Sequence, residues 1–478
     1  MKFKDYIWDK DFEIKGYYSE TPDGIIDNNY LSGTLYYSSS EIILELFGEF
    51  EEEQAFSFGF GKELEKIYGF SNNGKILILN TYREPMRYST TPGFPITKYR
   101  VKNFTIYDVY YNGLDDFDYS RDSYCKLIDY LDSKMIMEYR FSFDHIKEWI
   151  EKSLVNIKHK ENQDIFESAI NEYKPTKVSV NSLGIDFEDG ATLHSLYDTT
   201  SFNSDYYINV KSSNLEVRHF KEFYDASLKF KEFVEVISNT PLSFTNIEFI
   251  VQYKTLNQKC IPLIKGKYFV QHARKFKKWK KNSNNEISLN RLNDKFEIIL
   301  NNWFMKAHVL EFIVRQFSKT LHGDLYLEDQ LVDAIRNLEV YSRNFTKFTA
   351  SKPTLSSEQE NARQKVIDFI NTSILKEFRR NLKNRIKPKY REPKLSERLL
   401  NLFENIDLDN QIKLFSKFKD KELLVQKLVD TRNYYTHGDL KENYPNLITN
   451  FNEMYEVKVL LQDVLRYYIY QELDMKYK

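Results

Sequence analysis

The sequence predicts a multi-domain α+β protein in which a β-rich N-terminal region precedes an all-α helical bundle. Short apolar runs alternate with polar residues in the first part of the chain, which is typical of half-buried strands. From about residue 290 the apolar residues recur at helical spacing instead. We therefore expect a β-rich subdomain at 1–140, a second β-rich subdomain with helices at 141–285, and a helical domain at 286–478. The first two could form one unit.

The strands are predicted from period-2 alternation between turn residues. In the first subdomain they are expected at Leu31–Tyr37, Glu41–Phe47, Lys75–Asn80 and Lys102–Tyr111. The period changes near Phe143–His159, which predicts an amphipathic helix. The second subdomain is then expected to contain two strands and one helix, at Lys177–Phe187, Tyr206–Val217 and Lys221–Ile237.

The helical domain is predicted from apolar residues at positions i, i+3, i+4 and i+7. Turns that contain Gly, Pro or Ser separate several of these segments. The expected helices are Ile298–Thr320, Leu325–Thr346, Gln359–Ile386, Leu395–Asn405, Lys421–Tyr435 and Asn446–Tyr477.

Composition excludes several classes of protein. The chain has 478 residues, enough for two to four domains at about 100 to 200 residues each. Its 15 Gly and 11 Pro are too few for a collagen-like or low-complexity chain. Because 69 basic residues balance 70 acidic ones, any contact with nucleic acid must be made by a local patch.

The cysteines and the hydropathy pattern predict a cytoplasmic protein without a membrane segment. Cys125 and Cys260 are the only cysteines, and there is no CxxC, so neither a disulfide framework nor a cysteine-rich zinc site is expected. No apolar run approaches the length of about 18 residues that a membrane span needs. No metal site or cofactor motif is expected either.

Two segments concentrate positive charge and are candidates for RNA binding. The first, His272–Lys281, contains Lys277 and Lys278 beside two aromatic residues. The second, Lys376–Lys394, has nine basic residues against two acidic ones. Such segments can grip phosphates, although a solvated surface is an equally ordinary interpretation. The candidate residues of the second segment are Arg379, Arg380, Lys383, Arg385 and Lys387.

One constellation near the C-terminus could carry out chemistry on a phosphodiester. Arg432 offers a permanently charged fork for phosphate oxygens, and His437 can give or take a proton near neutral pH. Asn433 is four residues before His437, so its amide could hydrogen-bond the ring. Arg432 and His437 lie about 140° apart on an ideal helix. They would converge only if the helix unwinds near Thr436 or if the partner comes from another chain.

These residues carry a resemblance to a known family. Arg432-Asn433-x-x-x-His437 resembles the R-x4-6-H motif of HEPN ribonucleases, and the C-terminal pattern resembles the ApeA-like HEPN family of anti-phage defence. Asn301-Asn302-Trp303-Phe304 and the helix with Leu338-Glu339 are similar to segments of that family. The N-terminal region resembles the ApeA N-terminal domain at four further places, which are Gly16-Tyr17-Tyr18, Gly33-x-Leu35, Ile43-x-Glu45-Leu46-x-Gly48 and Trp149.

The resemblance implies a metal-independent endoribonuclease that acts as a homodimer or a higher even oligomer. Its substrate would be RNA, with tRNA as one candidate, and its product a 2′,3′-cyclic phosphate. Arg432, Asn433 and His437 would be the catalytic residues. The N-terminal region would sense a trigger, for example one encoded by a phage, in abortive infection. The alternative is a non-catalytic HEPN scaffold that dimerises or binds RNA and carries a protein-binding N-terminal module.

Overall fold

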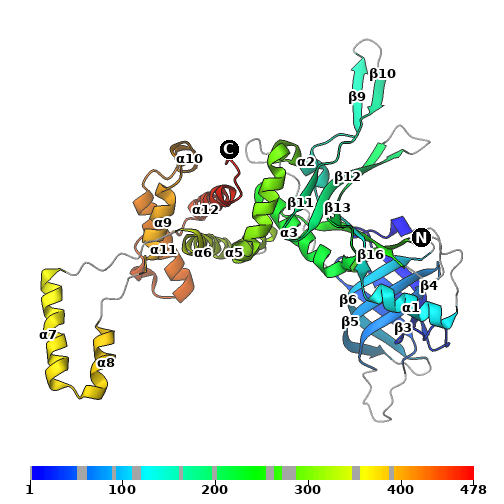
Figure 1. The fold of residues 1–478 in the computed structure, drawn as a ribbon, viewed down its shortest axis with the longest axis horizontal. Coiled ribbons are helices and arrows are strands. Elements are labelled where there is room, and N and C mark those ends of the chain that lie inside the picture. Colours follow the sequence, from blue (N-terminus) through cyan, green and yellow to red (C-terminus); the bar gives the residue numbers. More distant parts are fainter. Residues whose placement is uncertain are drawn as a thin grey trace. The chain divides into compact units, whose positions relative to one another are not determined.

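The chain divides into two compact units in the computed structural model (Figure 1). Unit 1 comprises Met1–Ala307 and Leu473–Met475, and unit 2 comprises His308–Glu472 and Lys476–Lys478. The division falls inside one long helix, α5 (Phe296–His322). The structure describes residues 3–50, 62–88, 93–109, 120–160, 165–195, 202–253, 263–271, 287–323, 325–346, 356–386 and 392–477.

Twelve strands of unit 1 form a single sheet whose strand pairings are all antiparallel. The order is β11-β12-β13-β8-β15-β16-β6-β3-β2-β1-β4-β5, so strands from both β-rich stretches of the sequence share it. The strands are β1 (Phe12–Ser19), β2 (Leu31–Tyr37), β3 (Ile42–Phe47), β4 (Leu64–Ser71), β5 (Lys75–Tyr88), β6 (Ile96–Asp108), β8 (Glu138–Phe143), β11 (Lys177–Val180), β12 (Ile185–Ser195), β13 (Phe202–Ser212), β15 (Phe244–Gln252) and β16 (Leu263–Val270).

Strand β6 is where this sheet branches. It pairs with β5 along one edge, and along the other edge it pairs first with β3, from Ile96 to Arg100, and then with β16, from Asn103 to Asp108. The pairings with β3 and β5 close β1 to β6 into a six-stranded barrel. The pairing with β16 starts the open half of the sheet. Two short ribbons complete the strands: β7 (Met135–Ile136) with β14 (Arg218–His219), and β9 (Val155–Lys160) with β10 (Ile165–Ile170).

Helix α3 (Phe220–Ser238) packs on the open half of the sheet (Figure 1). Its Phe230 is buried, with ring centroids 5.6 Å from Phe141 of β8 and 5.1 Å from Phe187 of β12. The first half of α5 joins this core, because the Trp303 indole N–H donates to the Lys229 carbonyl at 2.9 Å. The other helices of unit 1 are α1 (Arg121–Asp132), α2 (Ile146–Ile150), α4 (Leu289–Leu292), and the 3-10 turns η1 (Phe3–Asp5) and η2 (Asn293–Lys295).

Unit 2 is helical. Helix α6 contacts α9, α11 and α12, and α9 contacts α11, so these four form the centre of the bundle. Helices α7 and α8 contact each other as a hairpin (Figure 1). The bounds are α6 (Leu327–Phe345), α7 (Ser357–Ser373), α8 (Lys376–Arg385), α9 (Leu395–Glu404), α10 (Leu408–Leu414), α11 (Lys421–His437), the 3-10 turn η3 (Lys441–Asn443) and α12 (Phe451–Glu472).

The predicted fold class, a β-rich N-terminal region followed by a helical bundle, is confirmed. Two predicted helices were wrong in extent. The helix expected at Phe143–His159 ends at Ile150, because Glu151 takes a left-handed conformation with φ 56° and β9 follows. The helix expected at Gln359–Ile386 is broken at Ile374, whose extended backbone separates α7 from α8. Asn371-Thr372-Ser373 before the break are all weak helix formers.

Candidate active site

The C-terminal end of α11 holds the residues predicted to be catalytic. Helix α11 runs without interruption to His437 and stops at Gly438, which adopts φ 67° and ψ 25°. The Gly438 N–H donates to the Tyr434 carbonyl at 2.9 Å, so the last turn is closed. A left-handed residue after the last helical position is the usual place for glycine, because a side chain there would be strained.

The buried face of α11 determines which side of the helix is accessible. Its buried residues, Leu424, Val425, Leu428 and Thr431, follow one stripe of the helix. The Asp420 carboxylate caps the N-terminus by accepting from the Leu423 N–H at 2.9 Å. Towards the other end burial decreases, so that Arg432 and Asn433 are half-buried and His437 is exposed.

The chain after α11 is tied back to the helix. The Asp430 carboxylate accepts hydrogen bonds from the backbone N–H of Asn446 at 3.0 Å and from its side-chain amide at 3.2 Å. The buried Thr431 hydroxyl accepts from the Ile448 N–H at 3.1 Å. These two residues directly precede Arg432. They therefore fix the segment that follows the helix without using the two candidate catalytic side chains.

The half-buried arginine is held by its neighbour. Arg432 Nη1 donates to Asn433 Oδ1 at 3.1 Å, so the amide orients the guanidinium. The predicted bond from Asn433 to the His437 ring was wrong for this chain. In the described part of the molecule, His437 forms no hydrogen bond or ion pair. Arg432 uses only the Oδ1 acceptor of the Asn433 amide, and the Nδ2 donor makes no bond to the His437 ring.

Tyrosine side chains surround the end of the helix. Tyr434 contacts Tyr435 and Tyr444, with ring centroids 5.0 and 6.0 Å apart. The Tyr444 hydroxyl donates to the Asp439 carboxylate at 2.7 Å, and this bond raises the pKa of Tyr444. Burial and the nearby carboxylate of Glu328, in the first turn of α6, raise the pKa of Tyr435. Tyr435 and Tyr444 therefore stay neutral near pH 7 and can serve as hydrogen-bond groups beside the site.

Two comparisons with protein families match the chain. Residues 13–303 match ApeA N-terminal domain 1, which is more than half of the chain, and residues 332–478 match Apea-like HEPN. The chain belongs to the ApeA family of HEPN proteins. The predicted resemblance is thereby confirmed, and both matches support an anti-phage protein of this family. Searches of curated proteins and of solved structures gave no match.

The matched HEPN segment of this ApeA-family protein includes all of α11. Of the residues predicted to bind RNA, those on α8 are in the same segment: Arg379, Arg380, Lys383 and Arg385. Lys387, Lys277 and Lys278 lie outside the described residues. Among the residues that the structure describes, no three His, Cys, Asp or Glu side chains are grouped to hold a metal ion. None of the described helices combines the length and apolar character that crossing a membrane requires.

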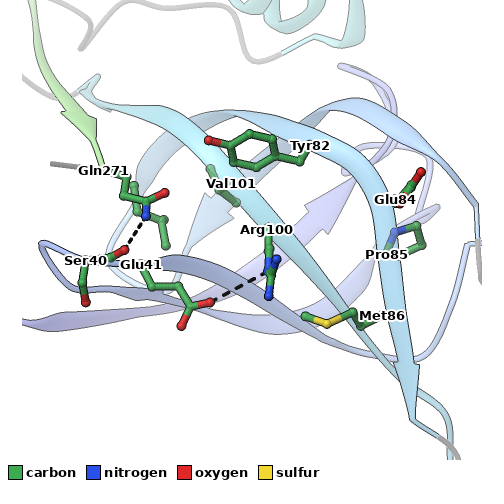
Figure 2. A pocket seen from close by; sticks show the side chains of 10 residues that line it. Ser40, Glu41, Tyr82, Glu84, Pro85, Met86, Arg100, Val101 and Gln271 are labelled. Carbon is green, nitrogen blue, oxygen red and sulfur yellow. Dashed lines mark hydrogen bonds and ion pairs between the residues drawn. The ribbon is translucent and has the colours of Figure 1, made fainter. Parts of the chain in front are cut away.

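The ApeA N-terminal domain carries a groove at the branch of its sheet (Figure 2). Strand β5 has a bulge there, because Thr81 pairs with Val101 and Pro85 with Tyr99, leaving three residues opposite Arg100. The groove has a volume of about 850 Å³, within the range of small-ligand sites. Its lining is Ser40, Glu41, Ile42, Tyr82, Glu84, Pro85, Met86, Arg100, Val101 and Gln271.

The groove combines a buried apolar floor with a charged rim. Ile42 and Val101 are buried, whereas the Tyr82 ring is about half exposed and the Lys102 ammonium lies 5.3 Å from its centroid. At the rim Arg100 and Glu41 form a loose ion pair of 3.9 Å. Glu84 has no ion pair within the described ranges. No sequence pattern predicted this groove, although Pro85, a proline inside a strand-like run, indicates a bulge.

We predict that Gly438→Ala loosens the helix end that carries His437. A left-handed alanine costs about 1 to 2 kcal/mol, although the added Cβ would meet no atom within 4 Å. Hydrogen exchange at the amides of the last turn of α11 should therefore become faster. Gly438→Asn is the matched control, because asparagine tolerates this conformation. Equal exchange in Gly438→Ala and the wild type would contradict this account of the helix end.

Proposed function

We propose that the protein is a metal-independent endoribonuclease of anti-phage defence by abortive infection, with tRNA as one candidate substrate. One observation carries the proposal: the exposed His437 and the amide-held Arg432 lie five residues apart at the end of an unbroken helix. A protonatable imidazole and a guanidinium are the two groups that cleavage of an RNA backbone needs most.

The chemistry uses a nucleophile that RNA itself supplies. The 2′-hydroxyl lies next to the scissile phosphodiester, so its attack is intramolecular. A base removes the 2′-hydroxyl proton, the 2′-oxygen bonds to phosphorus, and the bond from phosphorus to the 5′-oxygen breaks. An acid protonates the leaving 5′-oxygen. The products are a 2′,3′-cyclic phosphate and a free 5′-hydroxyl, and no metal ion takes part in these steps.

A dimer supplies the two proton-transfer groups. In one chain the continuous helix keeps Arg432 and His437 on different faces, about 140° apart. A two-fold axis beside the end of α11 would bring two copies of each residue to one phosphate. One His437 then acts as the base and the other as the acid. The two Arg432 side chains, each oriented by its Asn433, stabilise the charge that develops on the phosphoryl oxygens.

The exposure of His437 favours an enzyme over a scaffold. In a non-catalytic HEPN scaffold, we would expect this ring to be buried with both nitrogens bonded. Instead the ring is exposed and without a hydrogen bond to any described residue. An unbonded ring at the surface can exchange protons with a substrate, which a satisfied core histidine cannot do.

In this proposal the N-terminal domain regulates the nuclease. The groove at the branch of the sheet is the candidate site for a trigger, for example one encoded by a phage. Its apolar floor, aromatic side chain and rim of both charge signs suit a ligand that has an apolar body and charged ends. Binding there would raise the cleavage rate above its basal level during infection, in keeping with the family's association with defence.

The proposal predicts that His437→Ala lowers the rate of RNA cleavage by about 100- to 10,000-fold, since general acid–base catalysis contributes that much. Arg432→Ala should also abolish cleavage, and Arg432→Lys should restore little, because an ammonium lacks the bidentate fork. The assay uses labelled total RNA in the presence of EDTA, with chemical identification of the 2′,3′-cyclic ends. His308→Ala is the matched control, since His308 is an exposed histidine on α5. Full cleavage by both alanine variants, or complete loss of cleavage in EDTA, would contradict the proposal.

The regulatory part is tested separately. Tyr82→Ala combined with Glu84→Ala should leave cleavage by the purified protein within about twofold of the wild type, because the groove is remote in sequence from α11. The same double variant should lose protection of bacterial cells against phage. Tyr17→Ala, an exposed tyrosine on β1 outside the groove, is the control. Unchanged protection by the double variant would refute the groove as the trigger site.

A further inference from the structure

The hairpin of α7 and α8 exposes apolar side chains around its turn. Phe369 in the last turns of α7, Leu375 in the connection and Phe378 in the first turn of α8 are 58%, 68% and 52% exposed. Three large apolar side chains within ten residues would be costly to leave in water, and such patches commonly mark binding surfaces. Two of the three are aromatic.

The same hairpin carries a cationic face. Lys376, Arg379, Arg380 and Lys383 are spaced i, i+3, i+4 and i+7, so they lie along one side of α8. Glu377 is the only acidic residue of the helix. None of these four cations forms an ion pair with a described residue. Arg379 Nε donates to the Ile374 carbonyl at 2.6 Å, which anchors its stem near the turn.

Few side chains of the hairpin are buried. Ile370 is the one fully buried residue of α7, and α8 has none. The two helices are held together by Arg363, whose Nε donates to the Ile386 carbonyl at 3.2 Å. A capping box of Ser356 and Gln359 fixes the start of α7. Most of the hairpin surface is therefore available to a partner.

We propose that the α7–α8 hairpin binds an unpaired stretch of the RNA substrate. The cations along one side of α8 contact successive phosphates. Bases of the same strand, where it passes around the turn before Lys376, stack on Phe369 and on Phe378, which is on the opposite side of α8. This inference rests on the proposed function, because it assigns a place to the RNA that α11 would cleave. Unpaired RNA fits better than a duplex, because aromatic side chains stack only on bases that are free of the double helix.

An anionic membrane surface is the competing partner for such a patch. Binding of an amphipathic helix to a membrane grows with the apolar area that it buries. Three apolar side chains clustered at one turn provide little such area, and the exposed faces of α8 are otherwise polar. Phosphates spaced along an RNA strand match the row of four cations on α8 better than a membrane surface does.

The test measures RNA binding by the full chain with His437→Ala, so that bound RNA is not cleaved. The probes are a fluorescein-labelled 20-nucleotide oligouridine and an RNA duplex of the same length. We expect tighter binding of the single strand. Lys376→Glu combined with Arg380→Glu should weaken it at least tenfold and lower the slope of log affinity against log salt by about 1.4, because two phosphate contacts are lost. Lys365→Glu, an exposed cation of α7, is the matched control.

Stacking is tested at Phe378. Phe378→Ala should weaken binding of the single strand by about 5- to 100-fold, the range of one lost base–aromatic stack, and Phe378→Trp should restore it. Three results would overturn the inference. The charge reversal could weaken binding no more than Lys365→Glu does, or the protein could prefer the duplex. The third is Phe378-dependent binding to phosphatidylglycerol vesicles instead of RNA. If the wild type cleaves RNA but the hairpin variants bind normally, the inference fails and the nuclease stands. If the wild type binds RNA through the hairpin but cleaves no RNA, the proposed nuclease activity is refuted and the binding inference stands.

Discussion

The pitch of the α-helix is the constraint on which this account depends. Five residues along a helix turn the chain by about 140° and advance it by about 7.5 Å. Because α11 continues through Thr436 to His437, the side chains of Arg432 and His437 leave the helix in directions about 140° apart. In the proposed nuclease, a second Arg432 and a second His437 therefore come from another copy of the chain.

Residues around the end of α11 stabilise the helix end and leave the His437 ring exposed. Asp430 and Thr431 hold the segment that follows the helix, Gly438 ends the helix, and Asn433 orients the guanidinium. Of the side chains named here, only that of His437 is exposed. In unit 1 a single shared strand, β6, joins a closed barrel to an open sheet. A groove lies where the barrel and the open sheet separate.

Local patterns predicted much of the fold and the end of the helix that carries the candidate site residues. The alternation in Leu31–Tyr37 gave β2 to the residue, the periodicity of Lys221–Ile237 matched α3 within one residue at each end, and the glycine after His437 marked the end of α11. Part of what failed depends on contacts distant in sequence. The division of β6 between β3 and β16 is decided by long-range pairing, which no local pattern encodes. A local contact was missed as well: Asn433 accepts a hydrogen bond from its neighbour Arg432 and makes none to His437, although the spacing allows both.

The most direct test of the central claim is whether the ends of two α11 helices meet. Thr436→Cys, in a chain whose Cys125 and Cys260 are replaced by serine, places a thiol beside His437. A short bismaleimide should then link two chains covalently, and it should link far fewer through Leu408→Cys, an exposed site on α10. The account predicts a covalent dimer that forms rapidly at the concentration of the cleavage assay. Complete single labelling of Thr436→Cys by a monofunctional maleimide, with no covalent dimer from the bismaleimide, would contradict it.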